Sequence, residues 1–451
     1  MSANPLNEAV VEEATLEWFQ DLGYARLHGE TIAPGAPRAE RSSFEQVVLD
    51  GRLRAALRRI NPDAPLEALE EAHRKLLGIS SPSLVDANHE LHHYLVNGLQ
   101  TEFSKPDGGI GYALVFVLEF SNPDQNDWLV VNQFTIEEAG DTRRLDVAVF
   151  VNGMPLAIVE LKNADDPKAT TYAAYKQFQT YKAKQTALFV FNELLVASDG
   201  VSARLGNLSA DYERFLPWRT MEGESIASKS ENQLAVLLRG VFDKRRFLDM
   251  IRYFIVFESD GISTVKKNAG YHQFHAVARG IQATIAASRP DGDRRIGVVW
   301  HTTGSGKSLT MAFYAGRVIL APEMNTPTLV VITDRQDLDE QLFGTFCKCE
   351  DLLRQEPKRA RDRADLHELL KVAAGGVIFT TIQKFLPKNT GDTFPELSPR
   401  HNIVVMADEA HRSQYDFVDG FARHLRQALP NASFIGFTGT PIATSDKNTL
   451  M

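Results

Sequence analysis

The sequence has few cysteines, lacks long apolar runs and contains fewer basic than acidic residues, 49 against 58. It has two cysteines among 451 residues, Cys347 and Cys349. A Cys-x-Cys pair is poorly spaced for a disulfide and lacks the further ligands of a zinc site, so free thiols are favoured. No apolar run has membrane-spanning length, and no signal pattern leads the chain. We therefore expect a cytoplasmic protein that does not enter a membrane.

The formal net charge is −9, which does not favour DNA binding through bulk charge. Whole-chain charge does not exclude such binding, because a motor grips backbone phosphates in a local groove. The chain is long enough for two or three domains with proper cores, and it contains no repeat or low-complexity tract.

A glycine-containing loop follows the apolar run Ile296 to Trp300. It reads Thr302-Thr303-Gly304-Ser305-Gly306-Lys307-Ser308. At the start of a helix, backbone N–H groups of such a loop can cradle phosphates. Lys307 would reach the β and γ phosphates of ATP, and Ser308 would ligate Mg²⁺. A strict pattern has glycine where this chain has His301, so the match is to a relaxed form, and the alternative is a simple helix-capping turn.

A second motif, Asp408-Glu409-Ala410-His411, ends the apolar run Ile403 to Ala407. A carboxylate at the end of a buried strand can hold Mg²⁺, and its neighbour can orient or deprotonate the attacking water. We assign the first role to Asp408 and the second to Glu409.

Further apolar runs alternate with helical stretches, which predicts a parallel sheet with crossover helices. Polar residues stand at the carboxyl ends of these runs, where ligands of open α/β sheets bind. The runs are Thr328 to Thr333, Val377 to Thr381 and Phe434 to Thr438, and the last leads into Thr438-Gly439-Thr440-Pro441.

This ordered set resembles the first RecA-like domain of superfamily-two helicases and translocases over about residues 271 to 451. The resemblance makes Gln273 an adenine contact, although an isolated glutamine is otherwise more typical of a surface position. The second RecA-like domain of that family, with its arginine finger, is missing after Met451. We therefore expect this chain to bind ATP but to hydrolyse it poorly, and not to translocate by itself.

Residues 143 to 162 predict a second chemistry, because two apolar strands flank an Asn152-Gly153 turn. The spacing i, i+2 puts Glu160 and Lys162 on one face of a strand, with Leu161 directed to the core. A two-residue turn would send Glu160 to the face opposite Asp146, whereas a three-residue connection, 152 to 154, would pair the two carboxylates.

We therefore predict an odd-membered loop or a bulge, which Pro155 favours. Asp146 and Glu160 would then converge on a divalent metal, and Lys162 would stabilise charge or position the nucleophile. The alternative is a hairpin with a surface Glu–Lys pair.

Two further segments bear on this site. Gln177 and Tyr181 share one face of a predicted helix over 168 to 184 and could touch metal or DNA. The N-terminal segment from Glu8 predicts an amphipathic helix ended by Gly23, and nucleases of the Asp…Glu-x-Lys class often take another carboxylate from such a helix, here Glu12 or Glu13.

An Asp…Glu-x-Lys nuclease with Gln-x-x-x-Tyr, followed by a superfamily-two motor, resembles the restriction (R) subunit of type I restriction-modification enzymes. The resemblance spans nearly the whole chain. It implies an endonuclease that joins modification and specificity subunits, pumps double-stranded DNA with ATP and cuts away from the recognition site. It places the nuclease residues at Asp146, Glu160, Lys162, Gln177 and Tyr181.

The predicted fold class is α/β, with a PD-(D/E)xK-type nuclease domain before a RecA-like parallel-sheet ATPase domain. The predicted boundaries are 1–225 for the nuclease, 226–265 for a helical connector and 266–451 for the motor domain. Two competing functions remain open: a repair or recombination helicase-nuclease, and a truncated product that binds DNA and ATP without turnover.

Overall fold

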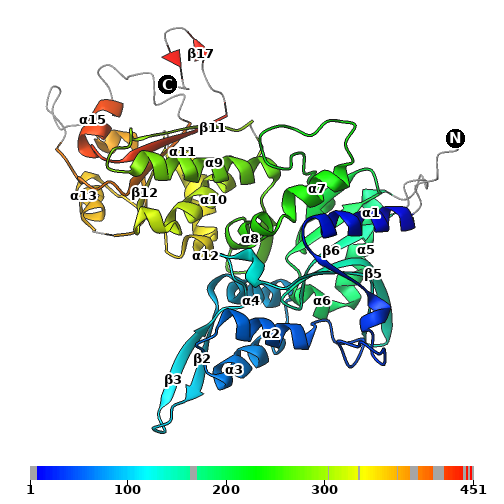
Figure 1. The fold of residues 1–451 in the computed structure, drawn as a ribbon. Helices are drawn as coiled ribbons and strands as arrows, with labels where there is room; N and C mark the ends of the chain where they lie inside the picture. The colour runs from blue at the N-terminus through cyan, green and yellow to red at the C-terminus, as the bar shows by residue number, and fades with distance from the viewer. Residues whose placement is uncertain are drawn as a thin grey trace. The chain divides into compact units, whose positions relative to one another are not determined.

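The computed structural model describes residues 8–162, 170–302, 304–333, 336–372, 374–385, 395–409, 421–439, 443–444 and 447–448. The chain divides into two compact units, which Figure 1 shows as a ribbon. The first unit takes the chain up to Ile255 together with Gly261–Tyr271, and the second takes Val256–Asp260 together with the chain from His272 onward. The domain boundaries predicted from the sequence stay predictions.

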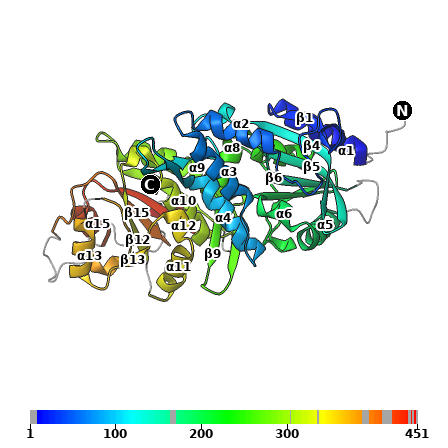
Figure 2. The same ribbon diagram turned by 90° about the horizontal axis from the view of Figure 1, so that it is seen from below.

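A mixed six-stranded sheet forms the centre of the first unit. Its order is β1-β4-β5-β6-β7-β8, with β1 parallel to β4, β6 parallel to β7 and the other neighbours antiparallel. Strands β4, β5 and β6 lie side by side in Figure 2. Every residue of β6 is buried, as expected for a strand with neighbours on both edges. The strands are β1 (Ala25–His28), β4 (Trp128–Glu138), β5 (Asp141–Val151), β6 (Met154–Leu161), β7 (Leu194–Ser198) and β8 (Ala203–Gly206).

Helices α1 (Glu8–Asp21) and α5 (Thr171–Lys184) pack against this sheet, α1 on β1, β4 and β6 and α5 on β6 and β7. Thr170 caps the N-terminus of α5, because its hydroxyl oxygen accepts a hydrogen bond from the N–H of Ala173 at 3.2 Å. The other elements of this part are η1 (Gly29–Ile32), α2 (Asp50–Ile60), α3 (Leu66–Leu77), α4 (Leu84–Asn97), the hairpin β2 (Leu99–Ser104) and β3 (Ile110–Val115), η2 (Pro123–Gln125), α6 (Thr186–Val190), η3 (Tyr212–Arg214), α7 (Gln233–Val241), α8 (Lys244–Tyr253) and β10 (Thr264–Asn268).

A parallel six-stranded sheet forms the centre of the second unit, in the order β11-β16-β15-β12-β14-β13. The parallel sheet predicted from the apolar runs is therefore confirmed. Its strands are β11 (Arg295–Trp300), β12 (Thr328–Thr333), β13 (Lys358–Arg359), β14 (Val377–Thr381), β15 (Ile403–Asp408) and β16 (Ser433–Thr438).

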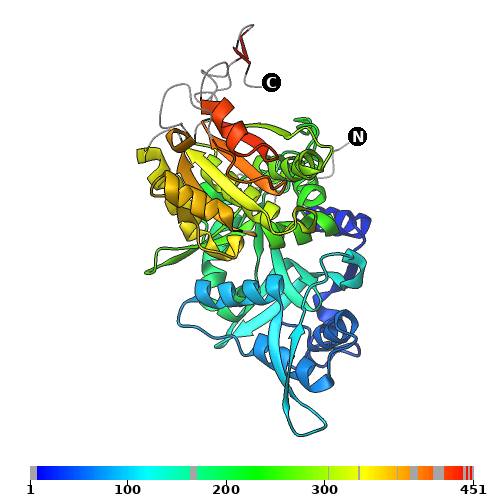
Figure 3. The same ribbon diagram turned by 90° about the vertical axis from the view of Figure 1, so that its left-hand side faces the viewer.

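Helices cover both faces of this parallel sheet, which explains why its central strands are apolar on both sides. On one face, Val330 and Ile378 pack with residues of α13 and α15 such as Leu366. On the other face, Phe437 stacks edge-on against Tyr314 of α10. Figure 3 shows the strands running among these helices. The remaining elements are β9 (Ile255–Ser259), of which all but Ile255 belong to this unit, α9 (Tyr271–Ser288), α10 (Lys307–Ile319), η4 (Pro322–Met324), α11 (Gln336–Lys348), α12 (Glu350–Leu353), α13 (Arg363–Lys371), η5 (Ile382–Phe385), α15 (Phe421–Ala428), β17 (Ala443–Thr444) and β18 (Lys447–Asn448).

Within the described residues, no helix combines the length and the apolar character that crossing a bilayer requires.

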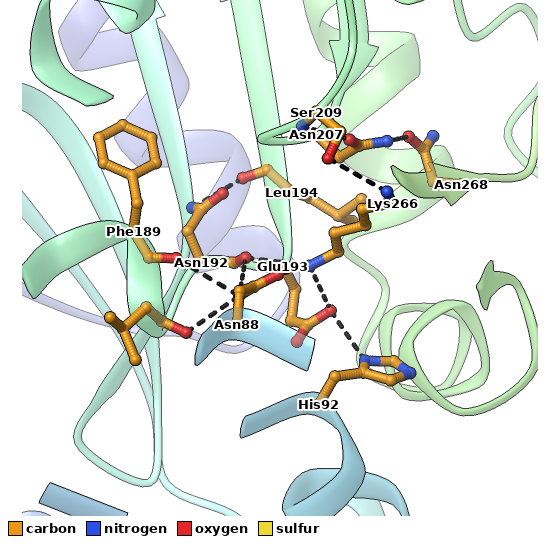
Figure 4. A network of polar contacts seen from close by, with 11 residues as sticks. Asn88, His92, Phe189, Asn192, Glu193, Leu194, Asn207, Ser209, Lys266 and Asn268 are labelled. Atoms are coloured by element: carbon orange, nitrogen blue, oxygen red, sulfur yellow. Dashed lines mark hydrogen bonds and ion pairs between the residues drawn. The ribbon is translucent and has the colours of Figure 1, made fainter. Parts of the chain in front are cut away.

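A buried ion pair fixes β10 to the rest of the first unit (Figure 4). The ammonium of Lys266 donates to the carboxylate of Glu193 at 2.9 Å, to the side chain of Asn88 at 2.8 Å and to the carbonyl of Asn192 at 3.0 Å. His92 contacts the same Glu193 oxygen at 3.1 Å. Both charged side chains are fully buried, so each depends on the other for compensation of its charge.

We expect Lys266→Met to lower the free energy of unfolding by about 3 kcal/mol, because it leaves the Glu193 carboxylate buried without its ammonium partner. Urea denaturation followed by tryptophan fluorescence measures this change, since Trp18, Trp128 and Trp218 report on the first unit. Lys105→Met, at an exposed position after β2, is the matched control and should change stability by less than about 0.5 kcal/mol. Equal stability of the two variants would show that the buried ion pair contributes nothing.

Candidate active site and nucleotide-binding loop

The hairpin between β5 and β6 has a two-residue turn. Asn152 and Gly153 have φ of 53° and 79°, as a type I′ turn requires, and Val151 lies opposite Met154. The expected three-residue connection, 152 to 154, is therefore wrong. Gly153 tolerates no side chain here, because a Cβ atom would lie 2.5 Å from the carbonyl oxygen of Leu49.

A bulge restores the register that the two carboxylates need. The pairing shifts between residues 149 and 150, and beyond the shift Val147 lies opposite Val159. Asp146 and Glu160 are the next residues on the two strands, so they are directed to the same face of the sheet. The bulge that the sequence predicted as one of two solutions is confirmed.

Asp146, Glu160 and Lys162 form a connected cluster, in which the two carboxylates are buried and the lysine is half-buried. The relative exposure of Asp146 is 8% and that of Glu160 is 1%. The N–H of Leu161 donates to Asp146 Oδ2 at 2.7 Å, and Lys162 Nζ donates to Glu160 Oε1 at 2.5 Å. Glu160 and Lys162 thus share one face, as predicted, and the surface ion-pair alternative is wrong. Glu160 Oε2 is buried and has no hydrogen-bond partner among the described residues.

Burial makes both carboxyl groups hard to ionise. Burial raises the pKa of Asp146 to about 6, although the Leu161 N–H and the charge of Lys162 oppose the rise. Burial also raises the pKa of Glu160 to about 8, and the negative charge of Asp146 adds to it while Lys162 opposes it. The two carboxylates repel each other when both are charged, and the single positive charge of Lys162 does not fully compensate them. A further positive charge at this place would stabilise the ionised pair.

Gln177 and Tyr181 lie on one face of α5, as predicted. Gln177 Nε2 donates to the Tyr181 hydroxyl at 2.7 Å, and that hydroxyl lies 3.5 Å from the carbonyl oxygen of Arg144. Burial raises the pKa of Tyr181 well above its usual value, and the charge of Glu160 raises it further. The tyrosine therefore stays protonated and faces the carboxylate cluster.

Of the two candidate carboxylates in α1, Glu12 is directed toward this region. Its carboxylate accepts a hydrogen bond from Asn132 Nδ2 at 2.7 Å and another from Gln133 Nε2. The charge of Glu12 also contributes to the raised pKa of Asp146. Glu13 instead forms an ion pair with Arg26 at 2.6 Å.

The role of the Asn132–Gln133 amide pair was not predicted from the sequence. Gln133 has a φ of 53°, unusual for a strand residue, and it stands across from Asp146. Two neighbouring strand residues normally point to opposite faces, so this local distortion is what allows both amides to reach Glu12. An Asn-Gln dipeptide within an apolar strand is the only signal that could have suggested it.

The donor set of Asp146 and Glu160 fits a divalent cation. Both groups are oxygen donors, both have raised pKa values that a cation would reverse, and the free Glu160 Oε2 lacks a partner. No cluster of three or more His, Cys, Asp or Glu side chains is close enough to hold a metal in the described part of the chain. The two carboxylates would therefore be completed by water or by substrate oxygens.

The glycine-containing loop, residues 302–308, is called the phosphate loop below. It follows β11 and leads into α10, as the sequence predicts. Gly304 and Gly306 have φ of 84° and 87°, values that residues with a side chain rarely adopt. The N–H of Ser305 donates to the Thr302 carbonyl at 3.1 Å, which closes the turn. Helix α10 begins at Lys307, and Ser308 lies half-buried in its first turn. Thr303, also assigned to the loop, lies outside the described residues.

Lys307 contacts both residues assigned to the second motif. Its Nζ lies 2.8 Å from Asp408 Oδ1 and also donates to Glu409. Burial would lower the pKa of Lys307, but the hydrogen bonds with Asp408 and Glu409 outweigh it and raise this pKa. The fold thus joins a lysine and two carboxylates that are about a hundred residues apart in sequence.

Gln273 lies against the phosphate loop. Its relative exposure is 5%, and its Nε2 donates to the Gly306 carbonyl and to Thr310 Oγ1, both at 3.2 Å. Its assignment as an adenine contact stays a prediction. The motif residues Ala410, His411, Thr440 and Pro441 lie outside the described residues.

Two family models match the chain and together span most of it. Residues 5–214 match the N terminus of the type I restriction enzyme R protein, and residues 272–451 match the SWI2/SNF2 ATPase. The first match covers the carboxylate cluster, and the second covers the phosphate loop and its acidic partners.

Curated relatives agree with these matches. The type I restriction enzyme HindI endonuclease subunit of Haemophilus influenzae is 42% identical over 98% of this chain. The putative type I restriction enzyme MjaIXP endonuclease subunit of Methanocaldococcus jannaschii is 36% identical over the whole chain. The chain spans only 43% and 44% of the lengths of these two relatives.

Among solved structures, the SWI2/SNF2 ATPase core of Sulfolobus solfataricus in complex with dsDNA aligns with 39% of this chain and 33% of its own, at 15% identity and a TM-score of 0.28. That likeness is too low to support an inference. The family models and the curated relatives are sufficient: this chain belongs to the family of type I restriction enzyme endonuclease (R) subunits.

Proposed function

We propose that the first unit is a PD-(D/E)xK-type endonuclease and that the second is a RecA-like nucleotide-binding domain of an ATP-dependent DNA translocase. The observation that carries the proposal is the bulge in the β5–β6 hairpin, because it brings two buried carboxylates and a lysine to one face. An ion pair between Glu160 and Lys162 that served only stability would not need the buried carboxylate of Asp146 beside it. It would also not leave Glu160 Oε2 without a hydrogen-bond partner.

Asp146 and Glu160 would hold Mg²⁺, whose chemistry is to polarise a phosphodiester and to lower the pKa of a bound water. Lys162, held by Glu160, supplies an ammonium that stabilises negative charge developing on the phosphate. Gln177 keeps the Tyr181 hydroxyl in place beside the carboxylates, where the two side chains can donate hydrogen bonds to DNA or to bound water.

In the second unit, the proposed ligands are ATP and Mg²⁺. The glycines and Lys307 would hold the phosphates, and Ser308 and Asp408 would ligate the cation. Glu409 would orient the attacking water. Gln273, which lies in α9 and contacts the loop, would bind the adenine base.

The proposed substrate is double-stranded DNA, and the proposed partners are the modification and specificity subunits of a type I complex. These subunits would choose the recognition sequence. Translocation belongs to the full-length subunit in this proposal, since this chain spans less than half of its relatives.

Cleavage of a supercoiled plasmid tests the nuclease assignment. We expect nicking or linearisation with Mg²⁺ and none with EDTA, and we expect Lys162→Ala to slow cleavage by about a hundredfold or more. Lys184→Ala is the matched control, because Lys184 also pairs with a carboxylate, at 3.3 Å from Asp141, but is half-exposed. Cutting that persists in EDTA, or in Lys162→Ala at the control rate, would contradict the assignment.

A further inference from the structure

His301 stands at the phosphate-loop position where the strict pattern has glycine, and the structure makes it a buried partner of the loop. Its relative exposure is 4%. Its Nδ1 lies 3.0 Å from the hydroxyl oxygen of Ser305, within the loop. If a histidine were merely tolerated in place of glycine, we would expect its side chain to be exposed to solvent, but the side chain of His301 is buried.

The hydrogen bonds of Ser305 determine the tautomer of His301. The Ser305 hydroxyl donates its hydrogen to the Thr302 carbonyl at 2.6 Å. Its oxygen can therefore only accept from His301, which requires the proton of a neutral imidazole to lie on Nδ1. His301 Nε2 then carries a lone pair, and this nitrogen is buried with no hydrogen-bond partner among the described residues.

A second histidine holds the same loop residue from another side. His272 Nε2 lies 3.0 Å from the backbone carbonyl of Ser305, and the two imidazole rings are 5.5 Å apart. Burial lowers the pKa of His301 to about 4, and the charges of His272 and Lys307 add to this effect. The environment thus keeps His301 neutral, which is the state that the contact with Ser305 needs.

The arrangement has a cost that glycine would avoid. A buried nitrogen without a hydrogen-bond partner destabilises the folded protein, because it loses its contact with water and gains none in return. This cost must be offset by another interaction, and among the described residues the hydrogen bond of the His301 side chain is the one with Ser305.

We propose that His301 is a positioning residue of the nucleotide site: as a neutral imidazole protonated on Nδ1, it fixes the Ser305 hydroxyl and holds the phosphate loop ready for a nucleoside di- or triphosphate. Preorganisation of this kind strengthens binding because the loop loses less conformational freedom when the phosphates arrive. The inference rests on the proposed nucleotide binding by this loop and adds a residue to it.

Binding of a fluorescent ADP analogue at pH 7.5 tests the proposal on four variants. His301→Gly restores the strict pattern, yet we expect it to weaken binding about tenfold, the equivalent of one hydrogen bond. Ser305→Ala should weaken binding equally, and the double variant should be no worse than either single one. His301→Asn should stay within about threefold of the wild type, because its amide N–H can replace the Nδ1–H donor.

The tautomer gives a readout that a purely structural residue would not produce. ¹⁵N spectra of histidine-labelled protein should assign His301 to the Nδ1–H form both before and after ADP is added. If His301→Gly unfolds, Ser305→Ala and His301→Asn still decide the matter, because neither removes much volume from the core. Wild-type affinity in His301→Gly or Ser305→Ala, or an Nε2–H tautomer, would overturn the proposal.

The outcomes separate this inference from the function on which it rests. If the wild type binds no nucleotide, or binds it as well as Lys307→Ala does, the nucleotide site itself is wrong. If the wild type binds and Lys307→Ala does not, while His301→Gly binds normally, only the role of His301 is wrong.

Discussion

Glu160→Gln should abolish DNA cleavage and, at the same time, stabilise the metal-free protein. Burial and the charge of Asp146 raise the pKa of Glu160 to about 8 from an ordinary value of 4.5. Between these two values the folded chain binds more protons than the unfolded chain, so the free energy of unfolding falls as the pH rises. Glutamine cannot ionise, and the variant should lack this fall.

The expected stabilisation at pH 8.5 is roughly 3 to 5 kcal/mol, since each pKa unit corresponds to about 1.4 kcal/mol. Near pH 4.5 the two proteins should have nearly equal stability, because the Glu160 carboxyl is protonated in the folded wild type there. Urea denaturation from pH 5 to pH 8.5 measures the difference. Glu102→Gln, at an exposed position of β2, is the control, and because it keeps Glu160 it should show the same fall of stability with pH as the wild type.

A divalent cation should reduce the difference in stability between the two proteins. It binds the ionised pair in the folded state only, so a saturating concentration of about a hundred times the dissociation constant would stabilise the wild type by about 2.7 kcal/mol. Mn²⁺ should raise the melting temperature of the wild type and leave that of Glu160→Gln unchanged. Cleavage by the variant should fall by about a thousandfold or more, because a metal ligand is lost.

Two results would contradict the metal site. One is an equal response of both proteins to Mn²⁺, and the other is a Glu160→Gln variant that is less stable than the wild type at pH 8.5. Because the stability measurement needs no DNA and no partner subunit, it tests the carboxylate pair independently of catalysis.

Lys307→Ala should reduce the affinity for ATP and ADP by about a hundredfold or more, since it removes the ammonium that would pair with the phosphates. In the structure this ammonium contacts Asp408 and Glu409. In the proposed site the same lysine would pair with the phosphates, and Asp408 would ligate the cation.

Isothermal titration with ATP and Mg²⁺ measures this loss. Lys348→Ala is the matched control, because Lys348 is an exposed lysine in α11 of the same unit and should not alter binding. Asp408→Asn separates the contributions: it should weaken binding in Mg²⁺ but have much less effect in EDTA. A Lys307→Ala variant that binds ATP as the control does would remove the loop from the proposed site.

Local sequence determined the secondary structure of the second unit well. The apolar runs at 328–333 and 377–381 became β12 and β14 with the same bounds, and the loop before Lys307 begins a helix as predicted. These features follow from short-range periodicity and from glycine at positions with positive φ, so they could be recognised without knowledge of distant contacts.

The carboxylate site was predicted less completely, because its geometry depends on a single extra residue. A side chain alternates faces at every step along a strand, so one bulge decides whether Asp146 and Glu160 converge. The sequence allowed two solutions, and the structure has the bulge with a two-residue turn. Nothing local to Glu12 indicated that two amides of β4 would hold it.

By itself, the sequence determined which elements form and which residue types stand at their ends: the apolar strands, the phosphate-loop glycines, and the Asp…Glu-x-Lys and Asp-Glu pairs. Only the tertiary structure decided the bulge register, the burial that raises the pKa of Glu160, the contact of Lys307 with Asp408, and the burial of His301 against Ser305. The physical reason is the distance along the chain over which each interaction acts. Backbone propensity and periodicity act over a few residues, whereas desolvation and charge pairing depend on groups that meet only when the chain has folded.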